Sequence, residues 1–309
     1  MEKNQGTWSR DVLKGFERRP VGKGTLVRPS AQPTHPSAVI LHVHGYNDYF
    51  FQTHLASAFT DAGLAFYAVD LARAGRSLLQ GEVPHLLTDA REQGDDISAA
   101  VDAVVALHPG LALVIHGHST GGLTSAIWAA DRPHPALVGL VLNSPLFGAR
   151  HSALQRSLSA GLPAIAALRP LAVVSSHPSI YATHQHVSGS GRWEFDRAWK
   201  RPEGLPVRAA WANAVRHAQH RVAKGLGIAV PVLAARSDTS GPDSEDNRLL
   251  DFQDTVLDVE VIARMTPHLG SRVTELVIAG GVHDLSLSRD EPRAAYFDAV
   301  LSWIDSVMT

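Results

Sequence analysis

The feature that most restricts the fold of this chain is a serine framed by glycines between two regular elements. Leu111–Ile115 is an apolar run of strand length, and Gly117-His118-Ser119-Thr120-Gly121 follows it almost directly. From Thr120 to Ala130 the apolar residues fall near helical spacing. A strand that turns sharply into a helix is the context that the G-x-S-x-G nucleophile elbow requires, with glycines where side chains two residues from the serine would collide. The sequence therefore predicts Ser119 as a nucleophile above the edge of a sheet.

Further apolar runs of strand length alternate along the chain with stretches of helical spacing. Such alternation predicts an α/β fold, with a mostly parallel sheet covered by helices on both faces. We expect helices over Phe51–Ala62 and Ala90–Leu107, and one or two antiparallel edge strands within Val12–Arg28. The further expected strands are Ala38–Val43, Leu64–Val69, Leu137–Leu142, Val230–Ala235 and Val273–Ile278.

The alternation of predicted strands and helices stops between Pro145 and Gly227, which indicates an inserted segment. We expect a core formed by residues 1–145 and 229–309, and a helical cap or lid over residues 146–228. The alternative is a helical subdomain that packs on the core away from the site. Position favours the cap, because parallel strands carry active sites at their carboxyl ends and the insert departs from such an end. Expected pocket-wall residues are Phe147, Leu154, Leu158, Trp193, Phe195 and Trp211.

Composition excludes several classes of function. The 309 residues include no cysteine, so there is no thiolate nucleophile, disulfide or cysteine-based zinc site. The formal net charge of -2 gives no basic excess of the kind that binds nucleic acid, and small neutral substrates fit better. Histidines paired as H-x-H have no third ligand at a clear spacing, and no nucleotide-binding glycine motif is present. We therefore expect neither a metal nor a cofactor.

Targeting signals are not evident in the sequence. Met1–Pro20 is polar and lacks the apolar run of a secretory signal. The longest apolar runs fall short of the ~18 residues that suggest a membrane span. We expect a cytoplasmic protein without a stable membrane span, and the sequence gives no indication of its oligomeric state.

At this point the chain resembles the α/β-hydrolase superfamily. Within it the chain is similar to serine hydrolases such as monoacylglycerol lipases, lysophospholipases, carboxylesterases and S33-like serine aminopeptidases. The resemblance covers most of the chain and rests on four motifs. These are the elbow, His44-Gly45-Tyr46-Asn47-Asp48, the turn Asp70–Ser77, and Gly281-Val282-His283-Asp284.

The resemblance implies an oxyanion hole and a catalytic histidine. The backbone amide of Thr120, after the nucleophile, and that of Tyr46, in the H-G-x loop, would stabilise the oxyanion. The chain order in this fold is nucleophile, acid, base, with the base after the last core strand. His283 follows Val273–Ile278 and precedes a terminal helix around Glu291–Val307, so we assign it as the base. His217, His220 and His268 lie in the insert or before that strand.

Two aspartates compete for the role of the acid. Asp238 follows the strand Val230–Ala235, where such enzymes often carry it. Asp254 precedes His283 by 29 residues, enough for one helix and one strand, and stands in a sequence similar to a family turn that starts a helix. We favour Asp254 and keep Asp238 as the alternative; Asp258 and Asp284 are more distant choices.

These residues predict hydrolysis of carboxylic esters through an acyl-enzyme on Ser119. A small-molecule ester is the expected partner. Alternatives on the same triad are a small-peptide aminopeptidase, a lactonase or an acyltransferase. An aminopeptidase needs acidic groups in the cap for the substrate ammonium, and Glu194 and Asp196 are available. A binding protein that has kept the fold and lost catalysis is the non-enzymatic alternative.

Overall fold

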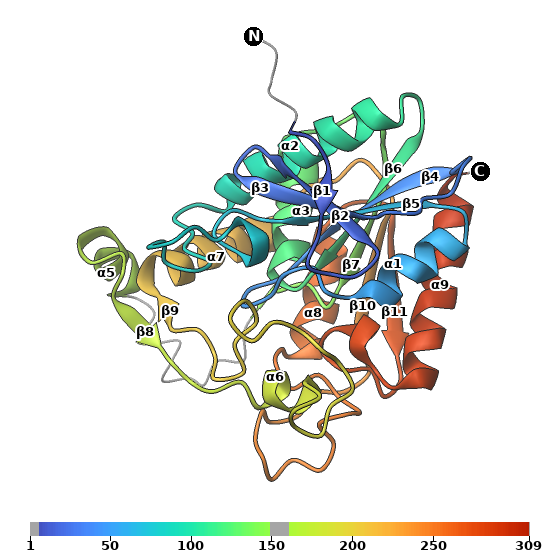
Figure 1. Ribbon diagram of the computed structural model, residues 1–309. Helices are drawn as coiled ribbons and strands as arrows, with labels where there is room; N and C mark the ends of the chain where they lie inside the picture. The colour runs from blue at the N-terminus through green and yellow to red at the C-terminus, as the bar shows by residue number, and fades with distance from the viewer. Residues whose placement is uncertain (1–5, 149–160, 309) are drawn as a thin grey trace.

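A computed structural model describes residues 6–148 and 161–308 of the chain (Figure 1). Leu154 and Leu158, two expected pocket-wall residues, lie outside the described residues. The central sheet has the order β1-β2-β3-β5-β4-β6-β7-β10-β11. Its strands are β1 (Ser9–Arg10), β2 (Phe16–Val21), β3 (Gly24–Pro29), β4 (Ala38–Val43), β5 (Ala65–Asp70), β6 (Ala112–His118), β7 (Leu137–Asn143), β10 (Val232–Ser237) and β11 (Val273–Ile278).

The sheet is parallel from β5 to β11 and antiparallel from β1 to β3, where β3 also pairs antiparallel with β5. The expected edge strands within Val12–Arg28 correspond to β2 and β3, and the short β1 adds a third. The six expected core strands are all present. Their predicted bounds differ by a few residues at some ends, since strands such as β6 continue as far as paired neighbours allow.

Alternate residues along the strands pack into two separate cores, one on each face of the sheet. In β4, Val39 and Leu41 point to one core while Ile40 points to the other. The first core is covered by α2, α3, α7 and α8, and the second by α1 and α9. The bounds of these helices are α1 (Thr53–Asp61), α2 (Ala90–Leu107), α3 (Thr120–Asp131), α7 (Ala209–Ala223), α8 (Val259–Met265) and α9 (Asp290–Met308).

Local signals explain where two of these helices begin. Asp89 and Glu92 form a reciprocal capping box at the start of α2. Asp258 accepts a hydrogen bond from the Glu260 amide and caps α8. Short 3₁₀ turns lie at Gly75–Ser77, Thr266–His268 and Leu285–Leu287. No helix in the described ranges is long and apolar enough to cross a membrane.

The segment between β7 and β10 is only partly helical. Its described part contains α5 (Leu162–Leu168), β8 (Val173–Ser175), α6 (Ile180–Gln185), β9 (Val207–Arg208) and α7. The strands β8 and β9 pair antiparallel as a second, small sheet. Figure 1 shows α5 and β8 standing out at the left, while α6 lies among long loops below the central sheet.

The strand order has a topological switch point between β4 and β6. These two strands are neighbours, with Val43 beside Gly117 in the register. After β4 the chain continues to β5, its neighbour on one side. After β6 it continues to β7, on the other side of the sheet. Loops that follow the two strands therefore diverge, and such a switch point is where open parallel sheets bind ligands.

Candidate active site

Ser119 lies in the turn between β6 and α3 with an uncommon backbone conformation. Its φ is +53° and its ψ is -116°, outside the regions that L-residues favour. The Ser119 amide donates to the Asn143 carbonyl at 3.0 Å, and its own carbonyl accepts from Leu123 and Leu146. These bonds to β7 and α3 hold the strained turn in place.

The flanking glycines allow the elbow to pack closely against β4. A Cβ at Gly121 would lie 2.3 Å from the His44 carbonyl oxygen and 2.4 Å from that of Val43. A Cβ at Gly117 would lie 2.8 Å from the Gly122 Cα. The expected crowding of the turn is present, but at Gly121 its cause is the end of β4 rather than the opposite side of the elbow.

Ser119, His283 and Asp254 form one hydrogen-bonded chain. His283 Nε2 lies 3.0 Å from Ser119 Oγ, and His283 Nδ1 lies 2.9 Å from Asp254 Oδ2. The other oxygen of Asp254 accepts from the amides of Val256 and Leu257 at 2.8 and 2.7 Å. All three side chains are buried, which limits competition from water. With the carboxylate on Nδ1, the Nε2 lone pair is directed at the serine hydroxyl.

The alternative acids have other partners. Asp238 Oδ1 accepts from the Gly280 amide at 3.0 Å and from Ser237 Oγ at 3.4 Å, and the residue is exposed. Asp258 caps α8. Among the residues considered for the acid, Asp254 is the one that the structure brings into hydrogen-bond distance of His283.

The two predicted oxyanion amides belong to two segments that adjoin Ser119, the start of α3 and the loop after β4. Thr120 is the first residue of α3, so its amide has no partner within the helix. The loop of Tyr46 passes close by, because a Cβ at Gly45 would lie 3.0 Å from the Ser119 Cβ. Neither amide donates to another group in the described part of the chain. Both are therefore available to a ligand.

A buried cluster of Asp48, His118 and Asp284 lies beside the hydrogen-bonded Ser119, His283 and Asp254. The sequence did not predict this cluster. Its potential ligand atoms lie within 4.8 Å of one another. Lys200 from the insert balances Asp48 at 3.0 Å, and His118 Nδ1 lies 3.6 Å from the other Asp48 oxygen. Lys200 thus balances the charge of Asp48, whereas Asp284 is held by neutral hydrogen-bond donors. Asp284 accepts from Gln52 Nε2, Asn143 Nδ2, and the amide and hydroxyl of Ser286.

Two residues of this cluster adjoin predicted site residues in the sequence, which is a signal for their place beside the site. His118 precedes Ser119 and Asp284 follows His283 in the sequence, so both are held near the candidate site by their neighbours. The ring of His118 lies 5.0 Å from that of His283. Burial raises the pKa of Asp284, but the charge of His118 and the hydrogen bond from Ser286 outweigh it and hold that pKa below its usual range.

The expected pocket-wall residues are dispersed. Trp211 packs on Tyr46, with ring centroids 4.3 Å apart. Phe147 is buried directly after Leu146, whose amide bonds the Ser119 carbonyl.

Trp193, by contrast, stacks on His54 at 4.2 Å and donates to the Leu287 carbonyl, away from the Ser119 and His283 side chains that it was expected to face. Phe195 packs on Phe51, with ring centroids 5.1 Å apart.

Tyr181 of α6 is an active-site neighbour that the sequence did not single out. Its ring lies 5.9 Å from that of His283, and its hydroxyl accepts from the Asp284 amide at 3.0 Å. The insert therefore touches the candidate base directly. Nothing in the local sequence around Tyr181 indicates this contact, because it depends on how the long loops of the insert pack.

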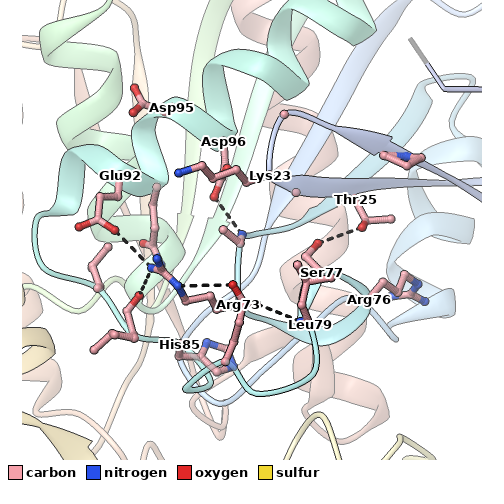
Figure 2. Close-up of a pocket in the computed structure, with 18 residues that line it drawn as sticks. Lys23, Thr25, Arg73, Arg76, Ser77, Leu79, His85, Glu92, Asp95 and Asp96 are labelled. Atoms are coloured by element: carbon pink, nitrogen blue, oxygen red, sulfur yellow. Dashed lines mark hydrogen bonds and ion pairs between the residues drawn. The ribbon is translucent and has the colours of Figure 1, made fainter. Parts of the chain in front are cut away.

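A cavity of about 810 Å³ is lined by the turn between β2 and β3, by residues within 72–87 and by the first turns of α2 (Figure 2). His85 lines it and packs its ring on that of Tyr46 at 5.3 Å. Ion pairs such as Arg73 with Glu92 cross its wall. So many charged groups suit neither an acyl chain nor another apolar ligand. The charged lining residues are Lys23, Arg73, Arg76, Glu82, Glu92, Asp95 and Asp96.

Comparison with known proteins identifies the family of this chain. The serine aminopeptidase S33 family matches residues 34–233, well over half of the chain. The chain belongs to this family. This S33 member is 33% identical to the monoacylglycerol lipase of Mycolicibacterium smegmatis over 118 residues, 38% of this chain and 40% of that protein. It is 26% identical to phospholipase YtpA of Bacillus subtilis over 123 residues, 37% of this chain and 42% of that protein. The S33 member thus spans about two fifths of the length of these curated relatives.

A solved structure extends the likeness to almost the whole chain. The monoacylglycerol lipase of Paleococcus ferrophilus matches 90% of this S33 member and is itself covered to 98%, with a TM-score of 0.67. The sequence identity is 18%, so this likeness shows the fold alone. The protein has the α/β-hydrolase fold, which confirms the fold predicted from the elbow and the strand order.

Proposed function

We propose that this S33 member hydrolyses carboxylic esters through an acyl-enzyme on Ser119. The observation that carries the proposal is the buried chain from Asp254 through His283 to the Ser119 hydroxyl. A serine hydroxyl is a weak nucleophile unless an adjacent base removes its proton, and the base must be held in the right tautomer. His283 is the adjacent base, and its hydrogen bond with Asp254 holds it in the right tautomer.

The reaction follows from the positions of these groups. His283 Nε2 takes the proton as Ser119 Oγ attacks the ester carbonyl, and Asp254 stabilises the imidazolium. The negative oxygen is stabilised by the amides of Tyr46 and Thr120 and by the N-terminus of α3. His283 then protonates the leaving alcohol. Water, deprotonated by the same histidine, attacks the acyl-enzyme and releases the acid.

We propose esters with an apolar acyl group as the substrate class, and glycerol esters or lysophospholipids as the first members to test. Two relatives carry the names monoacylglycerol lipase and phospholipase. The pair of Tyr46 and Trp211 offers apolar surface beside the oxyanion loop. Glu194 and Asp196, considered for a substrate ammonium, are exposed, which weakens the aminopeptidase alternative. A lactonase or an acyltransferase uses the same acyl-enzyme.

We also propose that residues 146–228 act as a cap over Ser119. Support comes from Tyr181 against His283 and Trp211 against Tyr46, which bring two elements of the insert to the site. The opposing proposal, a packing subdomain, predicts that pocket-facing substitutions leave chain-length preference unchanged. A cytoplasmic location stays a prediction.

The test compares wild type and Ser119→Ala on p-nitrophenyl esters of graded chain length, glycerol esters and amino-acid anilides. The variant removes one oxygen and little packing, so it should remain folded and lose roughly 10³-fold or more of its ester activity. Retention of more than about a tenth of the activity would exclude Ser119 as the nucleophile. Faster anilide than ester hydrolysis would favour an aminopeptidase.

A further inference from the structure

Four consecutive residues of the loop that follows β4 form hydrogen bonds with the insert. The loop carries the Tyr46 amide, one of the two proposed oxyanion donors, and its hydrogen-bond partners in the insert lie in segment 196–206. The contacts are Tyr46 Oη to the Pro206 carbonyl at 3.2 Å, Asn47 Nδ2 and Oδ1 to the Arg201 backbone at 2.9 Å each, Lys200 Nζ to Asp48 Oδ1 at 3.0 Å, and the Asp196 amide to Tyr49 Oη at 2.7 Å.

Lys200 makes the one ionic contact in this row, and it is buried. The side chains of Lys200 and Asp48 are 5% and 2% exposed. Lys200 Nζ also lies 5.0 Å from the ring of Phe51 and 5.5 Å from that of Phe195. Removing one partner of such a pair leaves an uncompensated charge out of water, which is far more costly than breaking an exposed pair.

Asp48 stays charged in this environment. Burial by itself raises the pKa of Asp48, but the charge of Lys200 and the contact with His118 hold that pKa well below its usual range. An ionised Asp48 without Lys200 would have to move toward solvent or take up a proton. The first change displaces the loop two residues beyond Tyr46, and the second removes the charge that faces Lys200 and His118.

The same aspartate also faces the elbow. Its second oxygen lies 3.6 Å from Nδ1 of His118, the residue before Ser119. Asp48 therefore stands between Lys200 on the insert and the turn that carries the nucleophile. The loop of Tyr46 and the start of α3 carry the two oxyanion amides, so their separation sets the geometry of the hole.

We propose that Lys200 is a positioning residue, which acts through Asp48 to hold the Tyr46 amide at the oxyanion position beside Ser119. This inference rests on the proposed ester hydrolysis. Lys200 touches neither substrate nor the reacting atoms. Its effect is confined to steps in which negative charge develops on the carbonyl oxygen.

A second ion pair between insert and core provides a matched control. Arg221 of α7 holds Asp131 through two contacts of 2.6 Å, and both side chains are partly exposed. Asp131 ends α3, roughly 16 Å along the helix from the Ser119 end. This pair joins insert and core without touching the oxyanion loop.

The experiment compares Lys200→Met with Arg221→Met and wild type. Titration with a fluorophosphonate gives the active fraction, and kcat is divided by it. The inhibition constant of a trifluoromethyl ketone, which forms a tetrahedral oxyanion on Ser119, reports the hole itself. For Lys200→Met we expect kcat to fall about 10–100-fold with KM within about twofold, and the inhibition constant to rise by a similar factor. Arg221→Met should match wild type in all three.

A double variant keeps the test decisive if Lys200→Met fails to fold. Lys200→Met with Asp48→Asn removes both charges, so no unpaired ion remains buried. It should fold, with kcat and the ketone inhibition constant between those of the single variant and wild type.

Three outcomes would overturn the inference: wild-type values in the double variant, a loss confined to the active fraction, or equal losses in Arg221→Met. A wild-type protein that neither cleaves esters nor reacts with the fluorophosphonate would instead overturn the proposed function.

Discussion

Ser119 combines a strained backbone with a hydroxyl that already has its acceptor. Its φ of +53° and ψ of -116° carry a cost of about 1–3 kcal/mol, which the surrounding hydrogen bonds must offset. The strain raises Oγ toward His283 Nε2, 3.0 Å away. At the residue scale the central question is which carboxylate orients that histidine, because the tautomer decides whether Nε2 can accept the proton.

Asp254→Asn should lower kcat about 10³–10⁴-fold, since an amide no longer fixes the tautomer of His283. Asp238→Asn should change kcat less than about threefold, because Asp238 bonds Ser237 and Gly280 instead of His283. The measurement is the steady-state rate of each variant on one ester, with folding checked by circular dichroism. The opposite pattern, an inactive Asp238→Asn beside an active Asp254→Asn, would transfer the role to Asp238.

Some residues of the candidate site could be predicted from the sequence and others could not. Ser119 and His283 follow from an elbow and from chain order, which are local or ordinal signals. Asp254 could be ranked above Asp238 by its spacing to His283. The pair of Lys200 and Asp48 could not be predicted, because it joins positions 152 residues apart and no motif marks Lys200.

At the scale of elements, the site depends on how closely the start of α3 approaches the end of β4. The two amides proposed for the oxyanion belong to these two elements, so a change in their separation affects the hole without touching the triad. Gly121 is the contact point, with backbone carbonyls of β4 and its loop where a Cβ would lie.

Gly121→Ala should force these elements apart. Overpacking of this kind destabilises by about 1–3 kcal/mol, and displacement of an oxyanion donor lowers kcat about 10²–10³-fold. Gly110→Ala is the control, because its φ is +84° and nothing lies within 4 Å of a new Cβ. It should cost about 1–2 kcal/mol of stability and leave kcat unchanged. Denaturation midpoints and kcat are measured for each variant. Full activity in Gly121→Ala would show that the start of α3 can move away from the end of β4 without displacing an oxyanion donor.

Elements with strong periodicity were predictable, and the insert was not. α2 was expected over the bounds that the structure shows, because its apolar spacing and its stop at His108 are local signals. In the insert, β8 and β9 are three and two residues long, too short for any pattern to indicate. Between α6 and β9 the chain runs as loops held by tertiary contacts, such as the Lys200 pair, rather than by local preference.

At the scale of the whole molecule, a buried histidine pair joins the central strands to the C-terminal helix. His42 Nδ1 lies 2.9 Å from His116 Nδ1, and His116 Nε2 lies 2.7 Å from the hydroxyl of Tyr296. Burial lowers the pKa of His116 to about 4 and that of His42 well below its usual value. Both rings are therefore neutral in the folded protein at neutral pH.

This difference predicts loss of stability in mild acid. Between pH 6.5 and about 4 the unfolded chain binds a proton at His116 that the folded protein does not, so the free energy of unfolding falls as pH falls. The slope from one such group is about 1 kcal/mol per pH unit. His116→Gln should reduce the slope by that amount, whereas His35→Gln, at an exposed site, should not. Urea denaturation at pH 7, 6 and 5 measures it, and equal slopes in wild type and His116→Gln would refute the prediction.

The most direct test of the central claim is to identify, by mass spectrometry, the residue that a fluorophosphonate modifies in the folded wild-type protein. The probe reacts with a serine that an adjacent base has activated, and it does not depend on knowing the ester. We expect one adduct, on Ser119, which is absent in Ser119→Ala and forms far more slowly in Asp254→Asn. Folded wild-type protein that stays unmodified, or an adduct on another residue, would contradict it.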